Sequence, residues 1–146
     1  MYTYDDILDF VSSQVGGDRA EITPETSLRD DFGVSGDDFG ELVQAFAERF
    51  HVDMSGYRWY FHHEGEVGIN IGAWFYPSPD KQVARIPVTP QVLLESANAG
   101  RWVVTYPPHK MDRIRWDLVM NMALLILPLL ALIAAYLWSP IHQILR

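Results

Sequence analysis

Hydrophobic side chains follow two different patterns along this chain, and the change comes at residue 118. Residues 118–138, LVMNMALLILPLLALIAAYLW, contain no charged side chain, and Asn121 is their one strongly polar residue. A helix that rises ~1.5 Å per residue over this run is about 31 Å long, close to the thickness of a bilayer's hydrocarbon core. Trp116 lies just before the run, and Tyr136 and Trp138 close it, as aromatic residues mark the two ends of membrane spans. The pattern predicts one transmembrane helix; a buried helix of a soluble core is the alternative.

Before this run, apolar residues recur every three or four positions in shorter segments, which predicts amphipathic helices. Three helices are expected to begin after the capping residues Thr3, Ser35 and Thr89. Asp38 stands three positions after Ser35, an Asp version of the capping box. We therefore expect the Ser35 hydroxyl to accept a hydrogen bond from the backbone of the second helix. Residues 57–66, YRWYFHHEGE, are expected to form a short helix or a turn.

A β-hairpin is expected before the third of these helices. Apolar side chains alternate with others from residue 67 to residue 75, which is the period of a strand. The turn sequence PSPDKQ follows, and residues 83–88 can form the second strand of the hairpin. Residues 101–105, RWVVT, are expected to form another short strand.

These segments predict a mainly α fold with one soluble domain and one anchor. The domain is expected to cover residues 1–105, with the hairpin inserted at residues 67–88. Residues 106–117 are then a juxtamembrane linker, residues 118–138 the transmembrane helix, and residues 139–146 a short tail. The part before the linker is long enough for a single domain with a modest core.

Acidic residues are concentrated in the first part of the chain. Residues 1–66 carry a formal charge of −11 and residues 67–146 a formal charge of +3, within a net charge of −8. An acidic domain repels nucleic acid, so we exclude nucleic-acid binding. The charge suits a partner protein with a basic docking face, and a surface charged only for solubility remains the alternative.

Basic residues stand mainly on one side of the predicted span. Lys110, Arg113 and Arg115 precede it, and Arg146 is the basic residue after it. Because positively charged flanks stay on the cytoplasmic side, we expect a single-pass protein of the inner membrane with its N-terminal domain in the cytoplasm. The first ten residues, MYTYDDILDF, lack the basic and long apolar regions of a signal peptide.

Side chains that bind metals or perform catalysis lack the spacing that known sites need. The candidates for a metal site are His51, His62, His63, Glu64 and Glu66. They show no HxxxH or HExxH pattern, and the chain has no cysteine, so we expect no metal site and no disulfide. We find no nucleophile with a matching base and no nucleotide-binding motif, so we expect no enzyme activity. The aromatic residues of YRWYF are expected to pack in the core.

Residues 23–54, TPETSLRDDFGVSGDDFGELVQAFAERFHVDM, resemble the central part of an acyl carrier protein. Carriers have a leucine-glycine-x-aspartate-serine-leucine motif, whose serine takes phosphopantetheine. When Phe32-Gly33 is set on the leucine-glycine pair, Ser35 falls on the aspartate and Gly36 on the serine. The segments GVSGDDFGEL, YRWYF and TPQVLLESANAGRW are similar to those of an uncharacterised bacterial family, domain of unknown function 1493, over residues 3–105. This resemblance implies an acyl-carrier-like helical bundle and brings no catalytic function.

The resemblance also implies where a partner and a prosthetic group would bind. In carriers the acidic second helix docks on basic patches of partner enzymes. The matching residues here are Asp37, Asp38, Glu41 and Glu48, for which a merely solvated face is the alternative. Glycine has no hydroxyl to carry phosphopantetheine, so we expect no such cofactor. Ser35 is one residue away, about 100° around a helix axis, and loading there in a shifted register is the alternative.

Three functions follow from these features. The leading hypothesis is a membrane-anchored, carrier-like adaptor that recruits a partner protein, such as an acyl-chemistry enzyme, at the cytoplasmic face. The second is a true carrier, loaded at Ser35, that delivers acyl groups to membrane enzymes. The third is a small subunit of a membrane complex that is recognised through its span, with Asn121 and Pro128 on the contact face.

Overall fold

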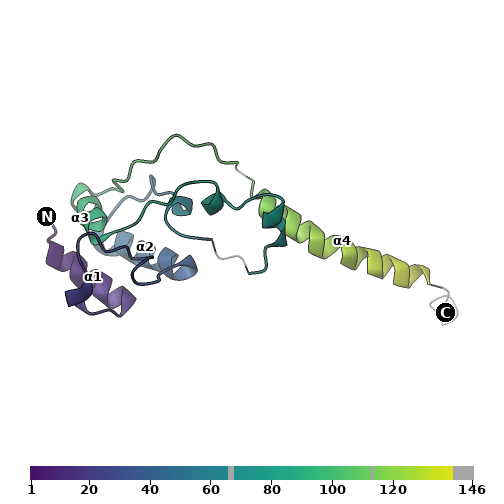
Figure 1. The fold of residues 1–146 in the computed structure, drawn as a ribbon, viewed down its shortest axis with the longest axis horizontal. Helices are drawn as coiled ribbons and strands as arrows, with labels where there is room; N and C mark the ends of the chain where they lie inside the picture. Colours follow the sequence, from purple (N-terminus) through teal and green to yellow (C-terminus); the bar gives the residue numbers. More distant parts are fainter. Residues whose placement is uncertain (66–67, 113, 140–146) are drawn as a thin grey trace. The chain divides into compact units, whose positions relative to one another are not determined.

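A computed structural model describes residues 1–65, 68–112 and 114–139 of the chain. In these residues the fold is mainly α, as predicted, with four α-helices, four short 3-10 helices and no strand (Figure 1). The described chain has one isolated β-bridge, between Asp53 and Arg101. Several residues used in the predictions lie outside the described residues: Glu66, Val67, Arg113 and residues 140–146.

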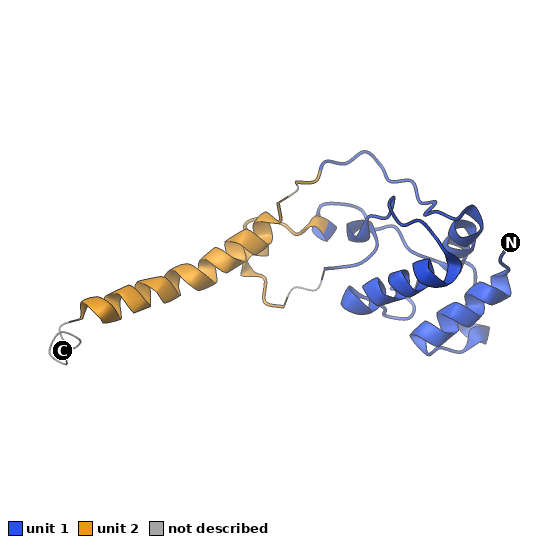
Figure 2. Cartoon of the chain, turned by 180° about the vertical axis from the view of Figure 1, so that it is seen from behind, with its two compact units in different colours: residues 1–66, 80–110 blue, residues 67–79, 111–146 orange. Residues whose placement is uncertain are grey.

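The chain divides into two compact units (Figure 2). The first, called here the helical domain, comprises residues 1–66 and 80–110, and the second, the α4 unit, comprises residues 67–79 and 111–146. The predicted insertion at residues 67–88 is therefore shared, because its first part belongs with α4 and its second part with the helical domain.

The helical domain contains the three predicted amphipathic helices, α1 (Tyr4–Val15), α2 (Gly36–Phe50) and α3 (Pro90–Ala99). Thr3 caps α1 in a full capping box with Asp6, and the Thr89 hydroxyl accepts a hydrogen bond from the first turn of α3. The two helices end at Gly16 and Gly100, whose φ angles of 67° and 66° lie in the left-handed region that glycine adopts most easily. Local sequence therefore sets both ends of α1 and α3.

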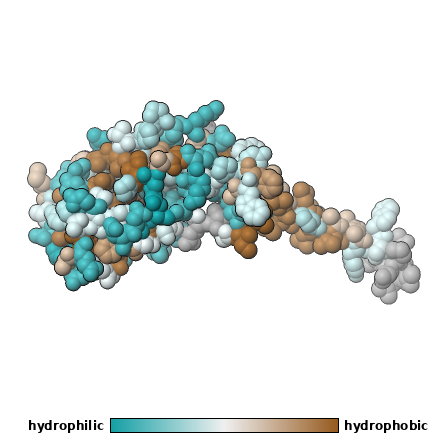
Figure 3. Space-filling view, in the orientation of Figure 1, coloured by the Kyte–Doolittle hydropathy of each residue, from teal (hydrophilic) through white to brown (hydrophobic). Residues whose placement is uncertain are grey.

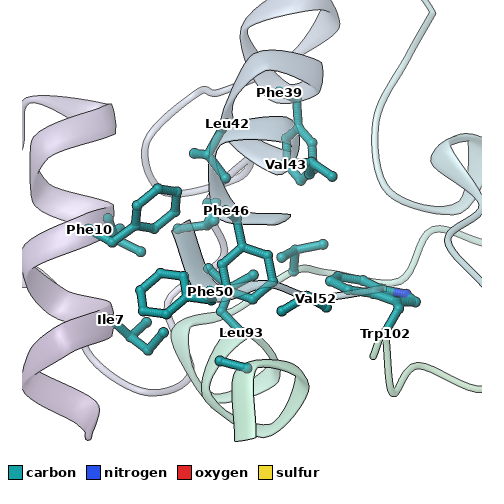
Figure 4. Close-up of a cluster of buried hydrophobic side chains, with 14 of the residues drawn as sticks. Ile7, Phe10, Phe39, Leu42, Val43, Phe46, Phe50, Val52, Leu93 and Trp102 are labelled. Carbon is teal, nitrogen blue, oxygen red and sulfur yellow. The ribbon is translucent and has the colours of Figure 1, made fainter. Parts of the chain in front are cut away.

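The core of the helical domain lies where α1, α2 and α3 face one another (Figure 4). The rings of Phe10, Phe46 and Phe50 meet there, with centroids 5.2 to 5.9 Å apart. Leu93 of α3 is fully buried beside them. Burial of one such side chain stabilises a fold by roughly 1.5–3 kcal/mol, so these contacts hold α2 firmly against its neighbours. The exposed face of α2 is thereby fixed as well.

The predicted β-hairpin is wrong. Over the described part of residues 67–88 the chain instead forms two 3-10 turns, η3 (Ile71–Trp74) and η4 (Pro79–Lys81). Alternation predicts a strand only when one face is buried, yet Ile69, Trp74 and Phe75 are all exposed. The side chain of Asn70 accepts a hydrogen bond from the Ala73 N–H, which favours a turn.

Two other expectations outside the long helices have different outcomes. The predicted strand at residues 101–105 is wrong, because Arg101 makes one isolated bridge and the following residues make no ladder. The short helix or turn expected within residues 57–66 is confirmed as η2 (Trp59–Phe61). Phe61 is fully buried, whereas Tyr57, Trp59 and Tyr60 are half-buried, so the aromatic cluster packs in the core only in part.

The α4 unit is built on one long apolar helix, α4 (Trp116–Trp138), which begins two residues before the predicted span. It is long and apolar enough to cross a membrane, and none of its most apolar stretch is buried in the protein. Figure 3 shows hydrophobic residues along its length. Exposed leucines such as Leu125 and Leu132 are unfavourable in water, so the alternative of a buried core helix does not describe α4.

Candidate partner-binding site on α2

The loop before α2 is held in place by a few buried or glycine-dependent positions. Leu28 is fully buried, and its backbone N–H donates to the carbonyl oxygen of Val88 at 3.1 Å. Gly33 has a φ of 71°, in the left-handed region, and its N–H donates to the Arg29 carbonyl oxygen at 2.8 Å. These bonds fix the approach of the chain to Ser35.

Ser35 is the N-cap of α2, but its side chain makes no capping hydrogen bond. The predicted capping box with Asp38 is therefore wrong. The reason lies in Gly36, whose φ of 58° departs from the right-handed conformation that the first residue of a capped helix needs. The Ser35 residue is exposed to solvent, and its hydroxyl is not engaged by the helix.

The resemblance to carriers sets Gly36 on the serine that takes their prosthetic group. Its positive φ suits glycine, and a side chain there would be strained by roughly 1–2 kcal/mol. A serine could not simply replace it without a change in the backbone. The first turn of α2 therefore presents backbone, and no hydroxyl, where a carrier presents its attachment group.

The predicted partner-binding residues all lie exposed on α2. With a turn of about 100° per residue, Asp37, Glu41 and Glu48 fall within about 40° of one another, and Asp38 lies about 60° from Glu41. In the described part of the chain none of the four forms an ion pair. Glu48 accepts one hydrogen bond, from Gln44 at 3.0 Å. The structure thus places four exposed carboxylates on one side of α2, none of them in an ion pair with another described residue.

A cavity of about 350 Å³ opens beside this acidic side of α2. Its walls come from the end of α1, the loop before α2 and the first two turns of α2: Gln14, Val15, Phe32, Gly33, Val34, Asp38, Glu41 and Leu42. Asp38 and Glu41 are common to the cavity and to the acidic side. Sequence reasoning identified these two and missed the wall from α1, since that contact depends on how α1 packs against α2.

Ion pairs join the loop before α2 to residues far along the chain. The Arg29 guanidinium donates two hydrogen bonds to the Glu64 carboxylate. The bond from Nε to Oε2 is 2.8 Å long. Asp30 pairs with Arg85 at 3.0 Å. The hydrogen bond from Arg29 is the main cause that lowers the pKa of Glu64. The hydrogen bond from the Ser27 hydroxyl is the main cause that lowers the pKa of Asp30. These partly exposed pairs position the loop more than they stabilise the fold.

The histidines considered for metal binding have other contacts. His62 is buried, and its two ring nitrogens lie 2.8 Å from the Ile86 carbonyl oxygen and from the Tyr106 hydroxyl. Burial lowers its pKa to about 4, so the ring is neutral at pH 7. His63 stacks on Phe39 of α2 with ring centroids 4.8 Å apart. Among the described residues no group of three metal-ligating side chains comes together.

The hydrogen bonds around Tyr106 assign the tautomer of His62. The Tyr106 hydroxyl accepts from Trp102 Nε1–H at 2.8 Å and from the Arg58 backbone N–H at 3.0 Å. Its own proton is then available for His62 Nε2, so Nδ1 carries the ring proton and donates it to Ile86. This network joins segments far apart in sequence and is structural, because it leaves the ring no free nitrogen.

The chain is similar to one protein family and, over a shorter stretch, to an acyl carrier protein. Residues 4–105 match the family described as "Protein of unknown function (DUF1493)". Over 48 residues the chain is 42% identical to an acyl carrier protein of Syntrophobacter fumaroxidans. This match covers 33% of the chain and 59% of that relative, so the chain spans about three fifths of the relative's length. No solved structure gave a significant match.

Proposed function

This chain belongs to the DUF1493 family, and we propose that it is a membrane-anchored, carrier-like binding module that works without a prosthetic group. It recruits a partner protein with a basic docking face to the cytoplasmic side of the inner membrane. The observation that carries the proposal is the first turn of α2, where Gly36 takes the carrier serine's position next to exposed Asp37 and Asp38.

The acidic side of α2 supplies the recognition in this proposal. Exposed carboxylates that form no ion pair within the described part of the chain raise the local negative potential and favour encounter with a basic surface. The partial similarity to an acyl carrier protein supports the same use of the helix. The cavity beside Asp38 and Glu41 adds a recess next to the charged surface, into which one side chain of the partner can fit.

The anchor supplies the location. α4 is long and apolar enough to span a bilayer, and its apolar side chains are exposed. Lys110 and Arg115 precede it and favour a cytoplasmic helical domain. Confinement to a surface raises the effective concentration of the domain near membrane-bound partners, so that modest affinity is enough for recruitment.

One observation favours a second candidate function, a carrier loaded at Ser35. Its hydroxyl makes no capping bond and the residue is exposed, so a transferase can reach it. Phosphopantetheine attached there would begin next to Val34, which lines the cavity. We rank this second because Ser35 precedes α2, whereas the carrier serine matches the following residue.

Charge reversal on α2 tests recruitment. The full-length chain is used to capture proteins from solubilised membranes, and D38K/E41K is compared with the control E21K/E25K, which reverses two exposed carboxylates elsewhere. We expect the wild type and the control to capture the same protein, and the α2 variant to lose at least about tenfold in affinity, or ~1.4 kcal/mol. Equal capture by all three would show that α2 is not the docking surface.

A further inference from the structure

We propose that residues 68–76 form a collar that lies in the lipid interface, beside the point where α4 enters the membrane. The collar is the segment GINIGAWFY, and it includes η3. The proposal rests on the membrane anchoring of α4 proposed above. It adds a second membrane contact, which sets the depth of the helix and does not itself cross the bilayer.

The collar is bonded to the first two turns of α4. The side chain of Asn121 accepts from the Ile71 N–H at 3.1 Å and donates to the Ile69 carbonyl oxygen at 3.0 Å. Asn70 Nδ2 donates to Asp117 Oδ2 at 2.9 Å. Both polar side chains on this part of α4 are therefore directed to the collar, and their bonds fix its position along the helix.

Close approach of the two backbones tightens this attachment. Gly72 is buried, and a Cβ atom there would lie 2.6 Å from the Asn121 backbone nitrogen and closer still to the Asp117 carbonyl oxygen. Only glycine fits such an approach without a shift of the backbone. The collar is therefore packed closely against the backbone of α4 at Gly72.

The outer surface of the collar is apolar and aromatic. Ile69 is 83% exposed, Trp74 85% and Phe75 60%, and Tyr76 lies 6.3 Å from the ring of Trp116. Residues 68–79 contain no charged side chain. Such a surface is unfavourable in water, and it offers no charge to a polar protein partner.

The position of the collar along α4 indicates that lipid covers its outer surface. Asp117 and Asn121 are four residues apart, about 6 Å along α4, at the end where the apolar run begins. Tryptophan and tyrosine favour this level of a bilayer, because their rings are apolar with one polar edge. Asp117 is only 2% exposed and pairs with Arg115 at 2.6 Å, so its charge is neutralised where the helix enters lipid.

Site-specific fluorescence can test the collar in the full-length chain. The chain has no native cysteine, so Phe75→Cys can be labelled with an environment-sensitive dye and reconstituted in phosphatidylcholine vesicles. Glu21→Cys serves as the control in the helical domain and Leu127→Cys as the control within α4. Quenching by lipid carrying a shallow nitroxide is compared with quenching by aqueous iodide, and lipid carrying a deep nitroxide is used for Leu127→Cys, which lies at the middle of α4.

We expect the dye in Phe75→Cys to be quenched several-fold more by the shallow nitroxide than the dye in Glu21→Cys, and to be protected from iodide. Quenching by iodide alone would overturn the collar proposal while Leu127→Cys, quenched by nitroxide lipid, upholds the anchor. Protection from both quenchers would also overturn it, because a second copy or another part of the chain would then cover the collar. If Leu127→Cys shows no lipid quenching, the anchor proposal itself fails.

Discussion

The side-chain amide of Asn121 donates to the backbone carbonyl of Ile69 at 3.0 Å, although the two residues are 52 positions apart. The one strongly polar residue of the apolar run therefore donates one hydrogen bond and accepts another within the chain. The hypothesis that a membrane complex recognises the span places Asn121 on the contact face. That hypothesis now depends on Pro128 and on apolar packing, because the Asn121 amide is already engaged.

Asn121→Leu is expected to release the collar from α4. The variant removes the acceptor of the Ile71 N–H and the donor to Ile69, and each lost bond is worth about 1 kcal/mol. Amide hydrogen exchange at residues 68–76 should accelerate roughly tenfold. Met122→Leu, on an exposed neighbouring position, is the matched control and should leave exchange unchanged. Slow exchange in both variants would show that these bonds do not hold the collar.

Gly72→Ala is expected to have the same effect for a steric reason. The added methyl group would collide with the backbone of α4 at Asn121, so either η3 or the helix must move. Gly68→Ala adds the same group where nothing lies within 4 Å. Limited proteolysis should therefore cut the collar of Gly72→Ala faster than that of Gly68→Ala. Equal rates of cleavage would contradict the close approach.

Mild acid is expected to destabilise the helical domain through His62. Its pKa is about 4 in the folded protein against an ordinary value of 6.5, because burial disfavours the charged ring. Between these values the unfolded chain binds the proton and the folded chain does not, so stability falls as the pH falls. The expected loss from pH 7 to pH 5 is about 2 kcal/mol.

Chemical denaturation in detergent, followed by tryptophan fluorescence, measures this loss. His62→Gln should be less stable at pH 7, yet it should lose less stability than the wild type between pH 7 and pH 5. Glu64 does not affect this comparison between pH 7 and pH 5. Because its pKa is lowered, its contribution to the free energy of unfolding is lost only below about pH 4.5. Identical pH dependence in the two proteins would refute the role of His62.

The orientation of the chain can be tested with single cysteines. Glu21→Cys lies in the helical domain and Gln143→Cys in the tail. In spheroplasts a membrane-impermeant maleimide should label the tail variant and spare the domain variant until the membrane is permeabilised. The reverse pattern would place the domain outside, and labelling of both without permeabilisation would argue against a span.

Local signals in the sequence predicted most of the helices. Thr3, Thr89, Gly16 and Gly100 mark helix ends through contacts with their own neighbours, so α1 and α3 could be located from sequence. The long apolar run likewise located α4. In each case the deciding interactions lie within a few residues along the chain.

The wrong predictions depended on distant or conformational effects. The alternation near Ile69 resembles a strand, but Asn121, far along the sequence, takes up the backbone bonds that a second strand would have made. The capping box at Ser35 failed because Gly36 adopts a positive φ, which composition alone does not reveal. The cavity beside α2 also needs the end of α1, which only the packed core brings there.

Absence of a prosthetic group is the central claim, and mass spectrometry of the intact chain tests it most directly. The full-length protein is incubated with a phosphopantetheinyl transferase and coenzyme A, with a known acyl carrier protein as the positive control and Ser35→Ala alongside. We predict that the carrier gains ~340 Da and that this chain keeps its mass. A gain of ~340 Da in the wild type would contradict the account, and its loss in Ser35→Ala would identify the protein as a carrier loaded at Ser35.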